Sequence, residues 1–106
     1  RDDALTDIDR ALDLEPDNPA ALLLRARINQ QAGDDDAALA DVETVLETAP
    51  DLPAALELRG LIAAERGNFS DAIRDFRRLA AKNPDDVAVI GQLGILFLAD
   101  KKPQEA

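Results

Sequence analysis

Two residue types that could do chemistry recur in step along the chain. Arg25 and Arg59 stand 34 residues apart, and the same interval separates three aspartates, Asp7, Asp41 and Asp75. A guanidinium can hold a carboxylate through two parallel hydrogen bonds, so these arginines could bind an anionic ligand or one of the aspartates. Because both residue types recur in phase, we favour a structural ion pair between neighbouring helices, with ligand binding as the alternative.

The residues that usually act as nucleophiles, bases or soft metal ligands are missing. The chain contains no His, Cys, Met, Trp or Tyr. Its hydroxyl side chains are Ser70, Thr6, Thr44 and Thr48, and none has a histidine to activate it. Self-contained nucleophilic, zinc or redox chemistry is therefore hard to build. We predict a protein that is not an enzyme, with no catalytic residue, no cofactor and no metal site.

Three consecutive acids, Asp34, Asp35 and Asp36, invite a calcium hypothesis. The alternating acids, central glycine and distal glutamate of an EF-hand loop are missing around them. Acids also favour the first turn of a helix, where the helix dipole is positive. We therefore prefer helix capping by Asp34, with a second predicted N-cap at Asn68.

The formal net charge is −10, from 12 basic and 22 acidic residues. This excess disfavours nucleic acids and anionic membranes as partners. Residues 1–52 hold fourteen acids and four bases, whereas residues 53–106 hold eight of each. Arg74, Arg77 and Arg78 form a basic cluster that could attract an acidic partner, although such clusters are more often a solvated face.

Compartment and source leave little trace in the composition. No apolar stretch approaches the roughly 18 residues of a membrane span, and no signal-peptide pattern is present. We expect a soluble protein, cytoplasmic or periplasmic. Arginine outnumbers lysine nine to three, as in many bacterial proteins from high-GC genomes. Because the chain starts at Arg1 rather than Met, we expect a piece of a longer protein.

A period of 34 residues organises the chain, as Pro16, Pro50 and Pro84 illustrate. Apolar residues at steps of three and four predict helices, while prolines and the glycines Gly33 and Gly67 predict their ends. The repeat frame gives residues 1–18 (second helix of a partial repeat), 19–52 and 53–86 (full repeats) and 87–106 (first helix of a partial repeat). The predicted helices span about 2–14, 19–32, 35–48, 53–66, 69–82 and 87–100, with another beginning at Pro103 and Gln104.

The period and its residues resemble the tetratricopeptide repeat (TPR) family over the whole chain. The matching positions in the two full repeats are Leu22, Ala26, Gly33, Ala38, Val42, Val45 and Pro50, and Leu56, Gly60, Gly67, Phe69, Ala72, Phe76, Leu79 and Pro84. The resemblance implies an all-α fold: a right-handed α-α superhelix, or solenoid, of helix-turn-helix hairpins. It also implies a concave groove, lined by the first helix of each repeat, that binds a peptide or partner protein.

Inward positions of the first helices supply the candidate groove residues. They are Leu23, Arg27, Gln30, Gln31, Glu57, Leu58, Leu61, Glu65, Gln92, Ile95 and Leu98. Some TPR adaptors clamp the acidic C-terminal tails of heat-shock chaperones with lysine, asparagine and arginine in this groove. Among the corresponding positions here only Arg27 could bind a carboxylate, so we predict that this clamp is absent. The groove suits an extended or helical peptide with apolar anchors.

We therefore expect a protein–protein interaction or scaffold module whose partner is unidentified. The alternatives are a non-catalytic domain of a larger enzyme and a self-assembly module, between which fold alone cannot choose. Neither end of the predicted array carries the polar cap that a solenoid normally has. Apolar residues of the last helix, such as Ile90 and Phe97, and of the first, such as Leu5, then lack cover. We expect self-association through these ends.

Overall fold

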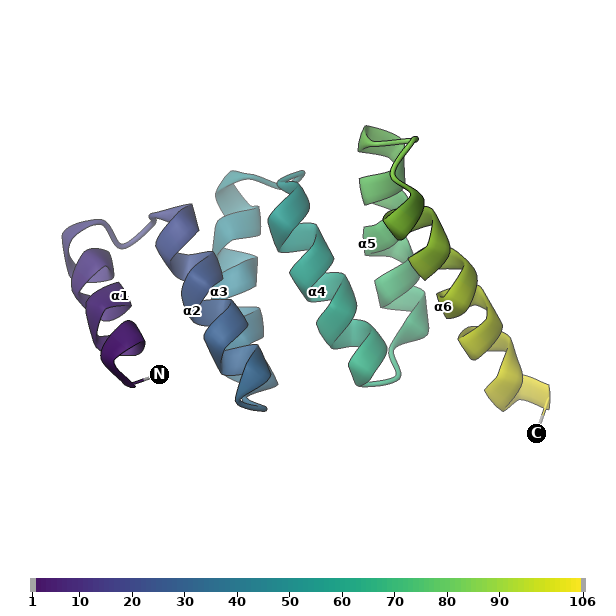
Figure 1. Cartoon of the computed structure of the whole chain (residues 1–106), viewed down its shortest axis with the longest axis horizontal. Coiled ribbons are helices and arrows are strands. Elements are labelled where there is room, and N and C mark those ends of the chain that lie inside the picture. The colour runs from purple at the N-terminus through teal and green to yellow at the C-terminus, as the bar shows by residue number, and fades with distance from the viewer. Residues whose placement is uncertain (1, 106) are drawn as a thin grey trace. The chain divides into compact units, whose positions relative to one another are not determined.

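Six α-helices and no strand make up the part of the chain that the structure describes, which is residues 2–105, with side chains for residues 4–100. In this computed structural model the helices are α1 (Asp2–Leu14), α2 (Pro19–Gln31), α3 (Asp35–Thr48), α4 (Pro53–Glu65), α5 (Phe69–Lys82) and α6 (Val87–Glu105) (Figure 1). The predicted all-α fold class is confirmed. The first five helices agree with their predicted bounds to within one residue.

Side-chain caps start the second and third helices. The Asn18 side chain accepts a hydrogen bond from the backbone N–H of Ala21 at 3.2 Å, and Pro19 fills the first helical position, where no N–H partner is needed. Asp34 accepts one from the N–H of Ala37 at 3.3 Å, which confirms its capping role. Asn68 stands at the equivalent position before α5, but its side chain makes no capping hydrogen bond.

The two glycine stops have the geometry that the sequence predicts. Gly33 and Gly67 adopt φ angles of +88° and +81°, a region that glycine enters without steric cost. The residue after each glycine donates its N–H five residues back: Asp34 to Asn29 at 2.8 Å and Asn68 to Ala63 at 2.8 Å. These bonds satisfy carbonyls that would otherwise have no partner at the end of α2 and α4.

The prediction for the end of the last helix is wrong. Instead of stopping near residue 100 and restarting at Pro103, α6 continues as one helix to Glu105. Lys101 occupies the position that Gly33 and Gly67 hold in the full repeats, so no residue here favours the left-handed stop. The predicted packing residue Ala106 lies outside the described residues.

The chain forms two compact units, residues 1–55 and residues 56–106, which are described separately. In the first unit α2 packs against both α1 and α3. The buried apolar residues of this unit are Ile8, Leu12, Leu22, Ala26, Ala38, Val42, Val45, Leu46 and Ala55. Ala26 and Ala38 are the small residues predicted at a helix crossing, where short side chains let two helices approach closely.

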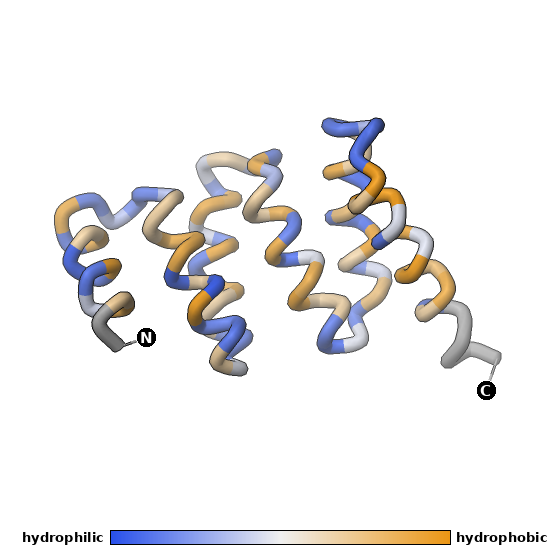
Figure 2. The backbone as a smooth tube through the Cα atoms, viewed as in Figure 1, coloured by the Kyte–Doolittle hydropathy of each residue, from blue (hydrophilic) through white to orange (hydrophobic). Residues whose placement is uncertain are grey.

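In the second unit α5 contacts both α4 and α6. The Phe76 ring lies over Gly60: a Cβ added there would come within 2.8 Å of the Phe76 Cε2 atom. Buried apolar residues from all three helices form the core: Leu56, Leu58, Ile62, Ala63, Ala72, Ile73, Phe76, Leu79, Val89 and Leu96. Figure 2 shows hydrophilic residues along α5 but a largely hydrophobic course for α6 up to residue 99.

Candidate functional site

The recurring arginines form bidentate ion pairs between the two helices of each hairpin. Arg59 on α4 donates from Nε and Nη2 to the two carboxylate oxygens of Asp75 on α5, both at 2.8 Å. Arg25 on α2 binds Asp41 on α3 in the same way, at 2.7 and 2.8 Å. Both aspartates are buried. The structural interpretation of these residues is therefore confirmed for both pairs.

Arg25 also binds a third helix. Its Nη1 donates to Asp9 on α1 at 2.8 Å, whereas Asp7, the aspartate in phase with the repeat, is exposed. The hydrogen bonds from Asp41 and then Asp9 raise the pKa of the Arg25 guanidinium, against the lowering effect of its partial burial. A raised pKa keeps the charge, and hence the contact, intact below the ordinary arginine range. A cleft of about 370 Å³ borders Arg25, but all three guanidinium nitrogens are already engaged by carboxylates.

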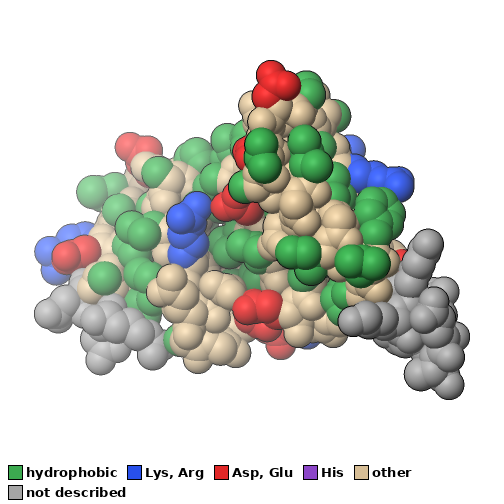
Figure 3. All heavy atoms as spheres, turned by 45° about the vertical axis from the view of Figure 1, so that its right-hand side comes forward, with side chains coloured by type: hydrophobic (Ala, Val, Ile, Leu, Met, Phe, Trp, Pro, Cys, Tyr) green, Lys and Arg blue, Asp and Glu red, His purple; other side chains and the backbone are tan. Residues whose placement is uncertain are grey.

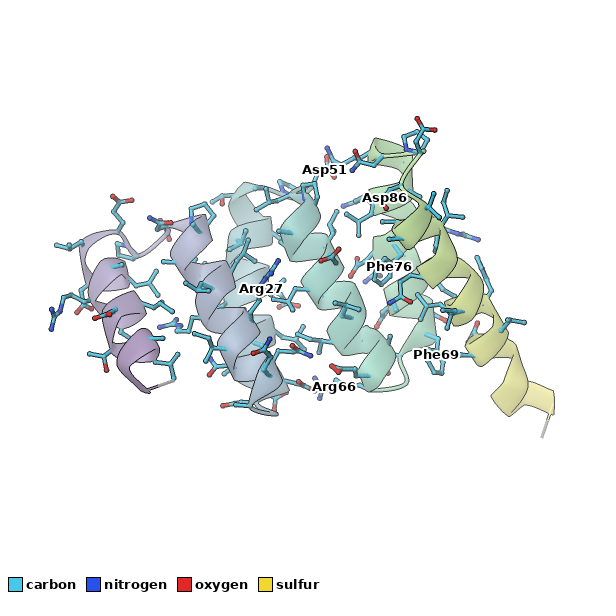
Figure 4. All side chains as sticks on the ribbon, viewed as in Figure 1. Arg27, Asp51, Arg66, Phe69, Phe76 and Asp86 are labelled. Carbon is cyan, nitrogen blue, oxygen red and sulfur yellow. The ribbon has the colours of Figure 1, made fainter. Side chains whose placement is uncertain are left out.

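A second cleft, of about 270 Å³, opens between α4 and α6 in the second unit. Glu57 and Leu61 line it from α4, and Ala88, Val89 and Gln92 line it from α6. Phe76 of α5 and Asp86, the residue before α6, complete the lining (Figure 4). We call this the α4–α6 cleft. It combines an apolar floor with polar groups at its walls, the usual composition of a ligand site.

Two carboxylates give the α4–α6 cleft its charge. Asp86 accepts hydrogen bonds through Oδ1 from the N–H groups of Ala88 at 3.1 Å and Val89 at 3.3 Å, and so caps α6. Glu57 is exposed on α4. No lysine or arginine is among the lining residues, so the cleft is acidic where it is not apolar.

The structure brings three predicted groove residues together in the α4–α6 cleft: Glu57, Leu61 and Gln92. Leu58, also on α4, is only 5% exposed and offers little surface to a ligand. The remaining candidates lie outside this cleft. Leu23 and Gln30 are half-buried on α2, Arg27 and Gln31 are exposed there, Glu65 is exposed on α4, and Ile95 and Leu98 are exposed on α6.

Sequence reasoning missed three lining residues. Phe76 was predicted as core because it recurs in phase with Val42, and it is buried, yet the same side chain also borders the cleft. Val89 was likewise assigned to the core face of its helix, while Asp86 carries the helix-capping signal of an acid two residues before an apolar run. That signal could have located Asp86 at the mouth of a first helix.

Among the described residues no helix is long and apolar enough to cross a membrane, and no group of three acidic side chains is placed to hold a metal ion. The chemistry available in the α4–α6 cleft is apolar contact, amide hydrogen bonding and attraction of a positive charge. Such a site binds other molecules without transforming them.

Helical hairpins of one fixed length, each held by an arginine–aspartate pair, define a helical-repeat protein. Two family models described as tetratricopeptide repeat match the chain, one over residues 1–53 and the other over residues 34–90. The chain belongs to the tetratricopeptide repeat family. Repeats of this family are generally protein–protein interaction modules. No curated protein matches the chain.

Proposed function

We propose that the chain is a peptide-binding interaction module and that the α4–α6 cleft is its peptide site. The observation that carries the proposal is the cleft itself, in which side chains from three helices surround a solvent-open space of about 270 Å³. Its apolar side chains Leu61, Phe76 and Val89 suit an apolar anchor of an extended or helical peptide.

The charge of the cleft limits the kind of peptide that fits. Glu57 and Asp86 are the only charged residues that line it, and both are acidic. A peptide that places a carboxylate beside them meets repulsion with no cation to offset it. We therefore propose a partner segment with an apolar anchor and no acidic residue next to that anchor.

Peptide selection against a plugged variant tests this function. A displayed random-peptide library is selected on the wild-type chain, and the enriched peptides are assayed on Ala88→Trp. Ala88 is exposed and lines the cleft, so a tryptophan there fills the site without entering the core. Ala81→Trp is the matched control, because Ala81 is also exposed in the second unit but does not line the cleft.

We expect the enriched peptides to be apolar, poor in acids, and to lose at least about tenfold in affinity on Ala88→Trp while binding Ala81→Trp normally. A tenfold loss corresponds to about 1.4 kcal/mol, less than the burial of one apolar anchor is worth. Equal binding to both variants, or selection of acidic peptides, contradicts the proposal.

A further inference from the structure

The outer face of α6 is apolar and uncovered. Val87, Ile95 and Leu98 are 79%, 63% and 66% exposed, and Ile90 and Phe97 are exposed as well. Figure 3 shows their side-chain type gathered along this helix. Large exposed apolar patches on a water-soluble surface mark interaction sites. We call the five residues the α6 outer face.

No charged side chain interrupts α6 from Val87 to Ala99, and its one polar side chain there, Gln92, lies in the α4–α6 cleft. Val89 and Leu96 are buried on the inner side of the same helix. The α6 outer face is therefore distinct from the peptide site, and both can be occupied at once.

Repeat symmetry indicates what kind of object the outer face can receive. Gly94 occupies in α6 the position that Gly60 occupies in α4. A Cβ at Gly60 would collide with Phe76 of the neighbouring helix, whereas a Cβ at Gly94 or Gly91 meets nothing within 4 Å. The surface against which a helix packs in α4 is thus open in α6, and the glycines allow close approach of another helix.

We propose that the α6 outer face pairs with the same face of a second copy, the two α6 helices crossing antiparallel at Gly94. Such a contact is isologous, so it closes as a dimer with two-fold symmetry. In this pairing, positions equally far from Gly94 in the two chains lie opposite one another. Asp86 of one copy then faces Lys102 of the partner subunit, and opposite charges meet at both ends of the pair.

The charge distribution favours this pairing over any that uses the other end. Residues 53–106 carry eight acids and eight bases, whereas residues 1–52 carry the whole net charge of −10. A dimer formed through α6 joins the two neutral halves. The acidic halves take no part in the contact, so their mutual repulsion does not oppose it at short range.

Pairing of α6 with α1 of another copy fails on chemistry. By repeat position α1 corresponds to α3, so Asp7 stands where Asp41 does, and Leu93 of α6 stands where Arg25 does. Packing α1 on α6 in the manner of α3 on α2 would press the Asp7 carboxylate against leucine instead of a guanidinium. A buried charge without a partner opposes such a contact.

Sedimentation of the 106-residue chain over a wide concentration range tests the dimer. We expect a reversible monomer–dimer equilibrium, and in Leu98→Glu a dissociation constant raised about a hundredfold, because the symmetric contact contains the change twice. Leu24→Glu is the matched control: Leu24 is 51% exposed, but on α2. A chain that stays monomeric throughout, assemblies that grow beyond the dimer, or equal losses in both variants overturns the proposal.

Cross-linking tests the register. The chain has no cysteine, so Gly94→Cys introduces one thiol at the two-fold axis, where oxidation should give a disulfide-linked dimer. Val87→Cys is the control: seven residues from the axis, its two copies lie about 21 Å apart in the antiparallel pair, at 1.5 Å of rise per residue. We expect efficient cross-linking only at position 94. Cross-linking at both positions indicates parallel helices, and none at position 94 removes the crossing point; either result overturns the assignment.

Discussion

Replacing Arg59 by alanine removes one member of a buried ion pair and leaves the other stranded. Asp75 is 2% exposed and receives two hydrogen bonds of 2.8 Å from the Arg59 guanidinium. Breaking a buried pair in this way costs about 3–5 kcal/mol. Because the Arg59 side chain keeps 26% of its exposure, water reaches part of the pair and we take the lower end, about 3 kcal/mol.

Urea unfolding followed by circular dichroism measures this loss. With a slope of about 1–3 kcal/mol per molar urea, the midpoint of Arg59→Ala should fall by about 1–3 M. The control is the double variant Arg59→Leu/Asp75→Leu, which removes both charges and should recover most of the loss. A loss below about 1 kcal/mol in the single variant, typical of exposed ion pairs, or a double variant as unstable as the single, would refute the reasoning.

Three further results follow from the same geometry. Gly60→Ala should lower the free energy of unfolding by about 1–3 kcal/mol, since the new Cβ meets Phe76 at 2.8 Å, whereas Gly91→Ala in open space should raise it by about 0.5–1 kcal/mol in the same thermal or urea assay. Gly33→Ala should cost about 1 kcal/mol or more by the same measurement, because its φ of +88° strains any L side chain. Calorimetry with an acidic chaperone-type tail peptide should show no binding; micromolar affinity that depends on Arg27 would contradict the absence of the clamp.

The helices were predictable because their start and stop signals repeat. Prolines and glycines act on the backbone of their own segment, so a period of 34 residues fixes each boundary without knowledge of the fold. The one wrong boundary, at the end of α6, occurs where Lys101 replaces the glycine that stops α2 and α4. There the expectation came from the repeat frame, and the local residues favoured a longer helix.

Side-chain partners were harder to predict than helices. The pairing of Arg25 with Asp41 follows from the period, but the contact with Asp9 depends on how α1 packs against α2. Both aspartates lie sixteen residues from Arg25, one on each side, a spacing that a search for symmetric partners could have used. Likewise Phe76 borders a cleft while belonging to the core, since one side chain can face two environments, and periodicity assigns each residue only one.

Mapping of backbone amide shifts by nuclear magnetic resonance tests the central claim most directly. A peptide selected on the wild-type chain is titrated into the isotope-labelled protein. The claim predicts that the largest shifts occur at Glu57, Leu61, Val89 and Gln92, the residues that line the α4–α6 cleft from two helices, and that Ala88→Trp abolishes them. Largest shifts confined to residues 1–55, or a pattern that persists in Ala88→Trp, would contradict it.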